Sequence, residues 1–343
     1  MRGIVRSQQL AFRVPIADIP SRLQECEALR CKGEPIRYAH ETRSGLARSS
    51  MITRDLRKIA RRPWTVPQAF QYCERLTRDH YENFPVASLM VPAEKRPFVY
   101  TIYSFARIAD DYADEPGLTI AERIDSLTEW EEQLTDAYRG HTQHPVFIAL
   151  RETIDRFEIP IELFQSLLIA FRSDVTTHRY ETFDEVLGYC QNSANPVGRL
   201  LLLLFNYRGE AFMELSDSIC TALQLANFWQ DVSVDLKKDR VYIPMEDIRE
   251  FGYSEEELLR RSFQPAFKDL MCYQVDRTRQ MFAEGKPLLT QVGKDLRMEL
   301  RLTWNGGMRI LRKIERADFN VLAKRPTISF LDKISLFLQA LSG

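Results

Sequence analysis

The chain has 343 residues, of which 45% are hydrophobic, and its 47 Lys and Arg nearly balance its 48 Asp and Glu. A chain of this length can bury a large core as one domain or two. The net charge of −1 gives no overall attraction to nucleic acid, so no nucleic-acid partner is expected. No stretch reaches the roughly 18 to 20 apolar residues that span a bilayer. We therefore expect a cytoplasmic protein, or one bound peripherally at the inner face of the membrane.

Residues 1–65 form a basic extension with little helical periodicity. Within it, residues 1–62 hold fourteen Lys and Arg against six Asp and Glu. Such a segment fits a disordered basic arm, a membrane-surface anchor, or sequence translated upstream of the true start. Because the ordered pattern begins only near Val66, we expect Met51 or a nearby codon to be the functional start.

From Val66 onward, apolar residues recur at three- and four-residue spacing, the pattern of amphipathic helices. Alternating strand patterns are scarce, and no linker-like composition interrupts the chain. We expect an all-α protein with one catalytic domain over residues 66–343. The expected helices are 67–78, 94–114, 119–138, 144–156, 160–178, 182–209, 211–236, 265–288, 292–316 and 327–341.

Cysteine and histidine spacing indicates no zinc site. Cys26 and Cys31 have no second pair at zinc-ligand spacing, and reduced thiols are expected for all six cysteines. His141 and His144 flank a loop, where we expect both to be solvated. The motifs of α/β-hydrolases, zinc proteases and P-loop enzymes are absent from the sequence.

Two acidic segments, Tyr103–Glu115 and Gln224–Pro244, are the most informative part of the sequence. Each sets two aspartates four residues apart inside an apolar helical pattern. At about 100° per residue, these aspartates share one helix face with other polar side chains. The first stripe holds Tyr103, Arg107, Asp110 and Asp114, and the second holds Gln224, Asn227, Asp231 and Asp235.

Carboxylates in a protein wall are costly unless a cation compensates them. A single Asp pair of this spacing is usually a solvated helix face, but two such pairs in apolar helices are hard to explain in that way. Hard carboxylate oxygens without thiolate or imidazole nearby suit Mg²⁺, which also binds substrate phosphates. The sequence thus predicts a magnesium site for a diphosphate.

A bundle would let the two acidic helices face each other across a central cavity. The helices between them carry apolar surface that would line this cavity below the metal site. A polar, metal-rich mouth above such a pocket suits a long hydrocarbon with a diphosphate head. The expected apolar surface includes Leu167, Leu168, Phe171, Val197 and Leu200–Leu204.

Several polar residues near the aspartates are candidates for contact with the leaving group. Arg107 could bind phosphate or hold the carboxylates in place, and the alternative is a simple salt bridge to Asp110 or Asp111. Arg240 and Tyr242 follow the second acidic helix and could close over the diphosphate. Tyr103 and Tyr242 could equally be ordinary wall residues.

The two acidic segments, together with HYENFPVAS (His80–Ser88) and YCQNSANPVGRL (Tyr189–Leu200), resemble the squalene/phytoene synthase family. The resemblance covers roughly residues 66–325. Within the family, the similarity is to bacterial HpnC-type hydroxysqualene synthases, on the segments NFPVAS, ANPVGRL and NFWQDVSVD. The resemblance implies an isoprenoid synthase helical bundle around a central cavity. It also implies Mg²⁺-dependent conversion of presqualene diphosphate and water to hydroxysqualene and diphosphate, in a route to squalene and hopanoids.

The resemblance also implies roles for individual residues. Tyr103, Arg107 and Tyr242 are the expected catalytic residues, and Tyr103 matches a tyrosine that faces the reacting carbons. Asp111 is expected to support the metal site without binding the metal. The implied metal ligands are Asp110, Asp114, Asn227, Asp231 and Asp235. The implied substrate-binding residues are His80, Asn83, Phe84, Arg107, Asn195, Gln230, Arg240 and Tyr242.

Two positions depart from the family pattern. Many relatives have a small-residue VAG sequence where this chain reads Ser193-Ala194-Asn195-Pro196. The Asn195 amide could orient water, and a role in helix packing is an equal alternative. Gln230 stands where many relatives carry Arg beside the second aspartate pair, so diphosphate binding need not be identical across the family.

The sequence is also compatible with two other functions. The main alternative is head-to-head condensation of farnesyl diphosphate to presqualene diphosphate or squalene, or a phytoene synthase activity; the other is a non-catalytic scaffold derived from the family. NADPH is not expected, although squalene synthases of this family bind it without a Rossmann fingerprint. A presqualene diphosphate synthase could hand over the lipid substrate.

Contact with a membrane surface is expected through the basic arm or the C-terminal helix (Ile328–Leu341). The apolar residues of that helix include Phe330, Leu331, Leu336 and Phe337. The alternative is that this helix packs on the core.

Overall fold

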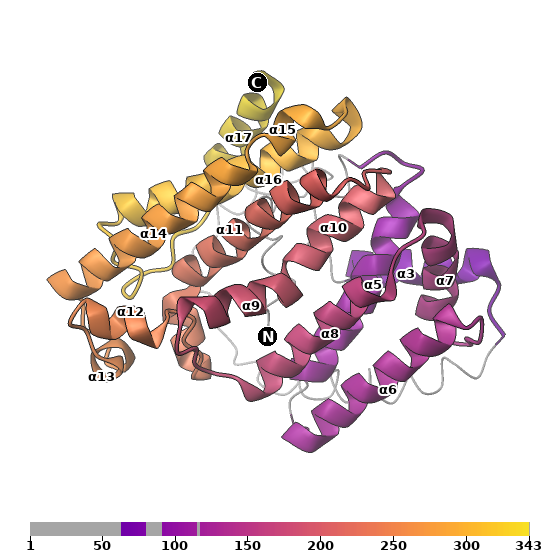
Figure 1. Cartoon of the computed structure of the whole chain (residues 1–343), viewed down its shortest axis with the longest axis horizontal. Helices are drawn as coiled ribbons and strands as arrows, with labels where there is room; N and C mark the ends of the chain where they lie inside the picture. The colour runs from indigo at the N-terminus through magenta and orange to yellow at the C-terminus, as the bar shows by residue number, and fades with distance from the viewer. Residues whose placement is uncertain (1–62, 80–90, 115–116, 343) are drawn as a thin grey trace, which may run out of the picture.

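The computed structural model describes residues 63–79, 91–114 and 117–342. All regular elements of these residues are helical, which confirms the predicted all-α class (Figure 1). None of the described helices is long and apolar enough to cross a bilayer. The helices are α3 (Val66–Asp79), α5 (Arg96–Asp114), α6 (Ile120–Tyr138), α7 (Pro145–Phe157), α8 (Ile161–Thr176), α9 (Phe183–Ser193), α10 (Asn195–Leu204), α11 (Glu210–Asp235), η4 (Leu236–Lys238), α12 (Met245–Glu250), α13 (Glu255–Leu259), α14 (Pro265–Gly285), α15 (Leu288–Gln291), α16 (Lys294–Arg316) and α17 (Phe330–Ser342).

Helix starts follow local capping chemistry. Thr119 caps α6 and forms a reciprocal capping box with Glu122, which satisfies two backbone N–H groups. His144 caps α7 by accepting a hydrogen bond from the Val146 backbone N–H. His144 is buried, and burial lowers its pKa to about 4, so the prediction that it is solvated was wrong.

The predicted helix 182–209 is two helices, α9 and α10, which meet at Ala194. Pro196 stands in the first turn of α10, where its missing N–H costs nothing, but it cannot continue α9. The short helices α12 and α13 were not predicted, because five or six residues are too few for an apolar period to emerge.

Two groups of helices flank the centre of the molecule. One contains α3, α5, α6, α7 and α8, and the other is built on α11, which packs against α14 and α16. Helices α9 and α10 contact both α8 and α11 and so join the two groups, as Figure 1 shows. The two acidic helices, α5 and α11, therefore belong to different sides of this arrangement.

Helix α11 contains a long, uninterrupted run of buried residues. Every residue from Thr221 to Ser233 is buried, on all sides of the helix. A helix that is covered all round normally carries apolar residues throughout. Gln224, Asn227 and Asp231 are exceptions, and their burial marks the place where a functional site is built.

Candidate active site

The first acidic segment forms a buried ionic cluster on α5. Tyr103, Arg107 and Asp110 are all buried on the inner face of the helix. The Arg107 guanidinium pairs with Asp111, and its Nη1 lies 3.4 Å from Oδ2 of Asp110. The alternative salt-bridge role considered for Arg107 is therefore present, and it fixes the two carboxylates in place.

Asp110 lacks enough positive charge in its surroundings. Burial raises its pKa to about 8, against the opposing attraction of Arg107. The neighbouring carboxylates Asp114, Asp111 and Asp174 raise the pKa further. This cluster therefore favours an additional cation.

The second acidic segment lies at the end of α11. Asn227 and Asp231 are buried, whereas Asp235 is partly exposed. Asp231 pairs with Arg325, which comes from the loop between α16 and α17; Nη2 of Arg325 donates to Oδ2 of Asp231 over 3.2 Å. Next to it, the Gln230 amide donates to the Pro326 carbonyl over 2.6 Å. Gln230 thus anchors the loop that carries Arg325.

The segment after α11 reaches back to α5. Lys238 Nζ lies 3.7 Å from Oδ2 of Asp114, and Arg240 Nη2 lies 3.4 Å from its Oδ1. Arg240 also donates to the backbone carbonyl of Asp174, on α8, over 2.8 Å. These contacts bring the two predicted acidic segments into one polar site, although 126 residues separate Asp114 from Arg240.

Asp174 and Tyr189 belong to this site and were missed by the sequence reasoning. The Tyr189 hydroxyl donates to Oδ1 of Asp174 over 2.8 Å, and both residues are buried. Burial raises the pKa of Asp174 to about 6, although Arg240 and Tyr189 act against this rise. Tyr189 opens the YCQNSANPVGRL motif, which could have identified it; Asp174 is a lone acid without a periodic signal.

Tyr242 is packed as a wall residue at the edge of the polar site. Its ring stacks on Phe228, with 3.8 Å between the ring centroids. It also stacks on Tyr180, with 5.7 Å between the ring centroids. Tyr242 also lies close enough to Asp174 for that carboxylate to raise its pKa, in addition to the larger effect of burial. It is therefore placed to fix the position of Asp174.

The donor set fits a hard divalent cation. Asp110, Asp114, Asp231 and Asp235 offer carboxylate oxygens and Asn227 offers an amide oxygen, without sulfur or imidazole. No three acidic, His or Cys side chains of the described ranges form a ready-made metal cage. This arrangement suits Mg²⁺, which commonly takes one or two carboxylates and completes its shell with water and substrate phosphates.

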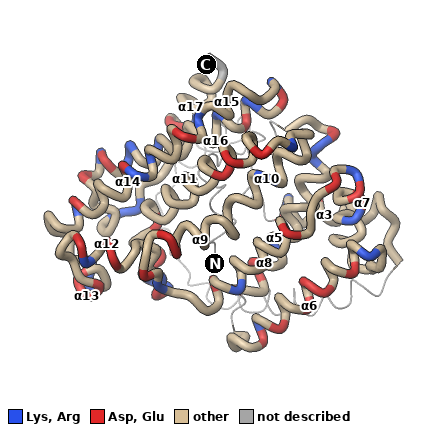
Figure 2. The backbone as a smooth tube through the Cα atoms, in the orientation of Figure 1, with Lys and Arg blue, Asp and Glu red and all other residues tan. Residues whose placement is uncertain are grey.

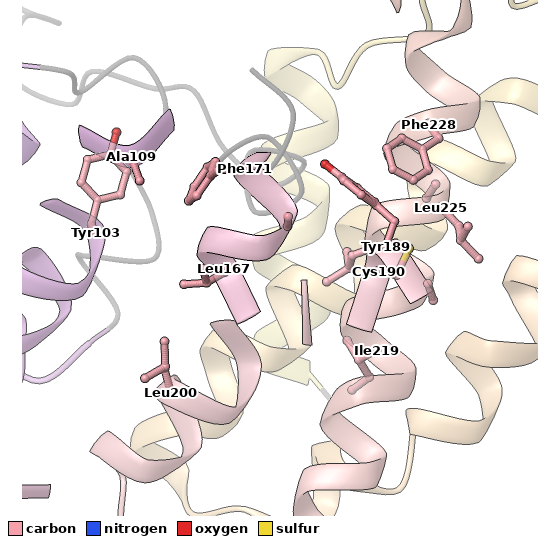
Figure 3. Close-up of a cluster of buried hydrophobic side chains, with 14 of the residues drawn as sticks. Tyr103, Ala109, Leu167, Phe171, Tyr189, Cys190, Leu200, Ile219, Leu225 and Phe228 are labelled. Atoms are coloured by element: carbon pink, nitrogen blue, oxygen red, sulfur yellow. The ribbon is translucent and has the colours of Figure 1, made fainter. Parts of the chain in front are cut away.

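An apolar pocket of about 120 Å³ lies below the polar cluster. As predicted, Leu167, Val197 and most of Leu200–Leu204 line it, whereas Leu168 and Phe171 lie in the surrounding core. Figure 3 shows the surrounding cluster of buried side chains, with Tyr103 from α5 and Tyr189 from α9 on opposite sides of this cluster and Leu167 and Phe171 between them. Tyr103 lines the pocket and lies one turn of α5 before Arg107, so pocket and polar cluster adjoin.

One acid lies inside this apolar pocket. Glu299 of α16 lines it and is buried, and its only hydrogen bond among the described residues comes from the Thr303 hydroxyl, 3.4 Å from Oε1. Burial raises the pKa of Glu299 to about 7. The sequence pattern of α16 did not single out this residue.

The remaining predicted residues lie elsewhere. The Asn195 amide oxygen accepts a hydrogen bond from Thr221 over 2.9 Å, and Asn195 lines a separate surface groove with Arg199 and Asp217. This contact matches the helix-packing alternative. His80, Asn83 and Phe84 lie outside the described residues, as do residues 1–62 with Met51.

Comparison with known proteins agrees with this geometry. A crystal structure of squalene synthase HpnC from Alicyclobacillus acidocaldarius superposes with a TM-score of 0.72 at 39% identity, covering 74% of this chain and 96% of that one. Hydroxysqualene synthase from Rhodopseudomonas palustris is 37% identical over 65% of this chain and 75% of its own length. Phytoene synthase from Arthrospira platensis is 28% identical over 77% of this chain and 90% of its own length.

The sequence profile of squalene/phytoene synthases matches residues 77–332, most of the chain and all of the polar site described above. The match includes α5, α8, α9 and α11, which carry Asp110, Asp174, Tyr189 and Asp231. The chain therefore belongs to the squalene/phytoene synthase family.

Proposed function

We propose that the protein is a Mg²⁺-dependent hydroxysqualene synthase, which converts presqualene diphosphate and water to hydroxysqualene and diphosphate. Its family acts on prenyl diphosphates. The finer assignment is supported by the similarity to the Rhodopseudomonas palustris hydroxysqualene synthase and to HpnC. The observation that carries the diphosphate chemistry is the cluster of buried carboxylates, paired with basic side chains, next to an apolar pocket.

The chemistry separates a diphosphate from an allylic or cyclopropylcarbinyl carbon. The carbon–oxygen bond breaks with its electron pair going to diphosphate, and water adds to the resulting cation and loses a proton. Bound Mg²⁺ would neutralise the charge that develops on the leaving diphosphate. In this proposal, Asp110, Asp114, Asp231 and Asp235 hold the metal ions, with Asn227 as a further oxygen donor.

The basic side chains of the site would receive the diphosphate. Lys238 and Arg240 are tied to Asp114, and Arg325 to Asp231, so their positive charges already lie beside the carboxylates that would bind the metal. Positioned charges stabilise a leaving group without reorganising during the reaction. The apolar walls around Leu167 and Leu200 would exclude water from the hydrocarbon until the cation forms.

Head-to-head condensation of farnesyl diphosphate is the second candidate. The similarity to phytoene synthases and to a dehydrosqualene synthase structure, at 25% identity and a TM-score of 0.71, favours it. Both reactions share the diphosphate departure, so the site geometry supports both. They differ in the substrate and in the fate of the cation.

Product analysis of purified protein distinguishes the two. The protein is incubated with Mg²⁺ and either presqualene diphosphate or farnesyl diphosphate, with and without NADPH, and the lipids are identified by mass spectrometry. Hydroxysqualene from presqualene diphosphate alone supports the proposal, because its formation needs water and no hydride donor. Product from farnesyl diphosphate, or strict NADPH dependence, would replace it with the condensation activity.

Substrate supply belongs to the same proposal. Presqualene diphosphate is a lipid, so we propose that the protein takes it from a presqualene diphosphate synthase, either by direct hand-over or through a membrane surface on the cytoplasmic side. Peripheral contact with that surface would keep the enzyme near the lipid. A co-reconstitution assay with a presqualene diphosphate synthase, with and without vesicles, separates these routes by their dependence on lipid.

A further inference from the structure

The C-terminal helix α17 is held to the rest of the protein by its inner face. Leu336 and Ala340 are buried in a small cluster with Leu302 of α16. Asp332 lies 2.9 Å from Nη1 of Arg309 and 2.6 Å from Nζ of Lys313. The alternative in which this helix packs on the rest of the protein therefore holds for its inner face, including Leu336.

The outer face of α17 is apolar and exposed. The exposed apolar residues of α17 recur at spacings of three, four, seven and eight positions, which places them on one side of the helix. Elsewhere in the described chain, exposed large apolar residues are scattered over α6, α8, α13, α14 and the loop after α13. A gathered apolar surface of this kind marks an interaction site. The α17 outer face consists of Phe330 (57% exposed), Leu331 (75%), Ile334 (44%), Phe337 (39%) and Leu338 (59%).

A basic stripe on α16 borders the start of this face. Arg309, Arg312, Lys313 and Arg316 lie on one side of α16, because Arg309 and Lys313, like Arg312 and Arg316, are four residues apart. Helix α17 packs on α16, and Figure 2 marks Lys and Arg in blue. Arg309 and Lys313 pair with Asp332, whereas no ion pair with another described residue joins Arg312 or Arg316. Burial lowers the pKa of Arg312, and the nearby Arg309 and Arg316 lower it further, whereas Glu315 acts in the opposite direction.

These two features together specify the partner. An apolar helix face beside a stripe of arginines is the arrangement of proteins that lie on anionic lipid bilayers, where apolar side chains enter the acyl boundary and cations contact the headgroups. A protein partner would accept the apolar face but would not by itself require the excess of positive charge. The family profile ends at residue 332, so most of this face lies beyond the matched region.

We propose that the outer face of α17, with Arg312 and Arg316, docks the protein on an anionic phospholipid bilayer. This inference goes beyond the proposed reaction and does not depend on which prenyl diphosphate is turned over. Docking by α17 would place the apolar pocket close to the membrane in which its lipid substrates dissolve. It also assigns the expected membrane contact to specific residues.

Vesicle co-sedimentation of the full-length protein tests the proposal without any substrate. Phosphatidylcholine vesicles are compared with vesicles that also contain phosphatidylglycerol. We expect binding to the anionic vesicles that weakens with added salt. The double variant Leu331→Ser/Leu338→Ser should lose at least about tenfold in affinity, and Arg312→Glu/Arg316→Glu should lose the preference for anionic lipid.

The matched control is Ile120→Ser/Ile169→Ser, which removes two exposed apolar side chains of α6 and α8 (59% and 52% exposed) and should bind as the wild type does. Equal binding of wild type and Leu331→Ser/Leu338→Ser, or no binding of the wild type, would overturn the proposal. A dimer of the free protein that this variant dissolves would show that the face meets a second copy instead. Cross-links from position 338 to residues 1–62 in free protein would assign the face to that segment and would also overturn it.

Discussion

Arg325 forms a two-point ion pair with Asp231, a contact that joins the loop before α17 to the end of α11 across 94 residues of sequence. Asp231 is almost fully buried, whereas Arg325 is about one-third exposed. The neighbouring Gln230 is uncharged. The positive charge beside Asp231 comes from Arg325, and Gln230 holds the loop that delivers it.

The first expectation concerns Arg325. In Arg325→Ala, Asp231 loses its cation and the leaving diphosphate loses a positive charge, so we expect turnover to fall by about tenfold or more. Steady-state kinetics with presqualene diphosphate measures the effect, and Arg325→Lys should restore part of it. Arg260→Ala, at an exposed i,i+4 pair with Glu256, is the control and should leave turnover unchanged. Unaltered kinetics of Arg325→Ala would exclude a role in the site.

Tyr189 and Asp174 provide a second test. Tyr189→Phe removes the hydrogen bond to buried Asp174 and should cost about 1–3 kcal/mol of stability, together with a clear loss of turnover. Tyr138→Phe is a matched control, because its hydroxyl bonds to the Ile159 carbonyl over 2.9 Å away from the site. Urea unfolding should show a loss in both variants, but activity should fall only in Tyr189→Phe. Equal activities would mean that this hydrogen bond is purely structural.

Metal binding gives a third test that needs no turnover. A ligand that binds only the folded state raises the unfolding temperature, so Mg²⁺ together with diphosphate should stabilise the wild type and a chelator should reverse the shift. Asp110→Asn and Asp231→Asn should each abolish most of this shift and lower turnover by about 100-fold or more, because they remove metal-binding charge. Asp136→Asn, an exposed acid at the end of α6, should keep the full shift. A normal shift in both site variants would contradict the metal assignment.

Glu299 should make stability depend on pH. Its pKa is raised to about 7 by burial, so the folded state holds this proton more tightly than the unfolded chain. The contribution of Glu299 to stability is therefore greatest at low pH and falls as the pH rises from the ordinary glutamate range through about 7. Gln at position 299 cannot ionise. The free energy of unfolding of Glu299→Gln, relative to that of the wild type, should therefore rise by up to about 3 kcal/mol between pH 5 and pH 8.

Urea unfolding at the two pH values measures this difference, and exposed Glu284 supplies the control variant Glu284→Gln. A constant difference between wild type and Glu299→Gln at both values would show that Glu299 does not titrate in this window. The comparison is independent of the reaction that the protein catalyses.

Helices with a long apolar period were predictable to within a few residues. The prediction 119–138 corresponds to α6 at 120–138, and 265–288 corresponds to α14 at 265–285. The periodicity of buried residues extends over several turns in these helices, so tertiary packing reinforces the local signal. The break at Ala194 was not predicted, because an apolar stripe continues across it and only Pro196 interrupts the hydrogen bonding.

The acidic stripes of the site were equally readable. Asp110, Asp114 and Asp231 stand at helical spacing within apolar segments, so their shared face follows from helix geometry. Asp174 and Arg325 were not found, because each is a single charged residue whose partner is distant in sequence. Glu299 was not found because it is a lone acid in the sequence pattern of α16, and only packing places it in the pocket. The roles of Asp174 and Arg325 follow only from packing: Arg240 donates a hydrogen bond to the backbone carbonyl of Asp174, and Arg325 pairs with Asp231.

The late position of Arg325 affects biosynthesis. Asp231 and the loop anchor Gln230 leave the ribosome long before Arg325 does, since translation proceeds from the N-terminus. Until almost the whole polypeptide has been made, the carboxylate at the end of α11 has no counter-ion from this loop. A nascent or C-terminally truncated chain would therefore carry the aspartates but not the arginine, so we expect full activity only in molecules whose synthesis is essentially finished.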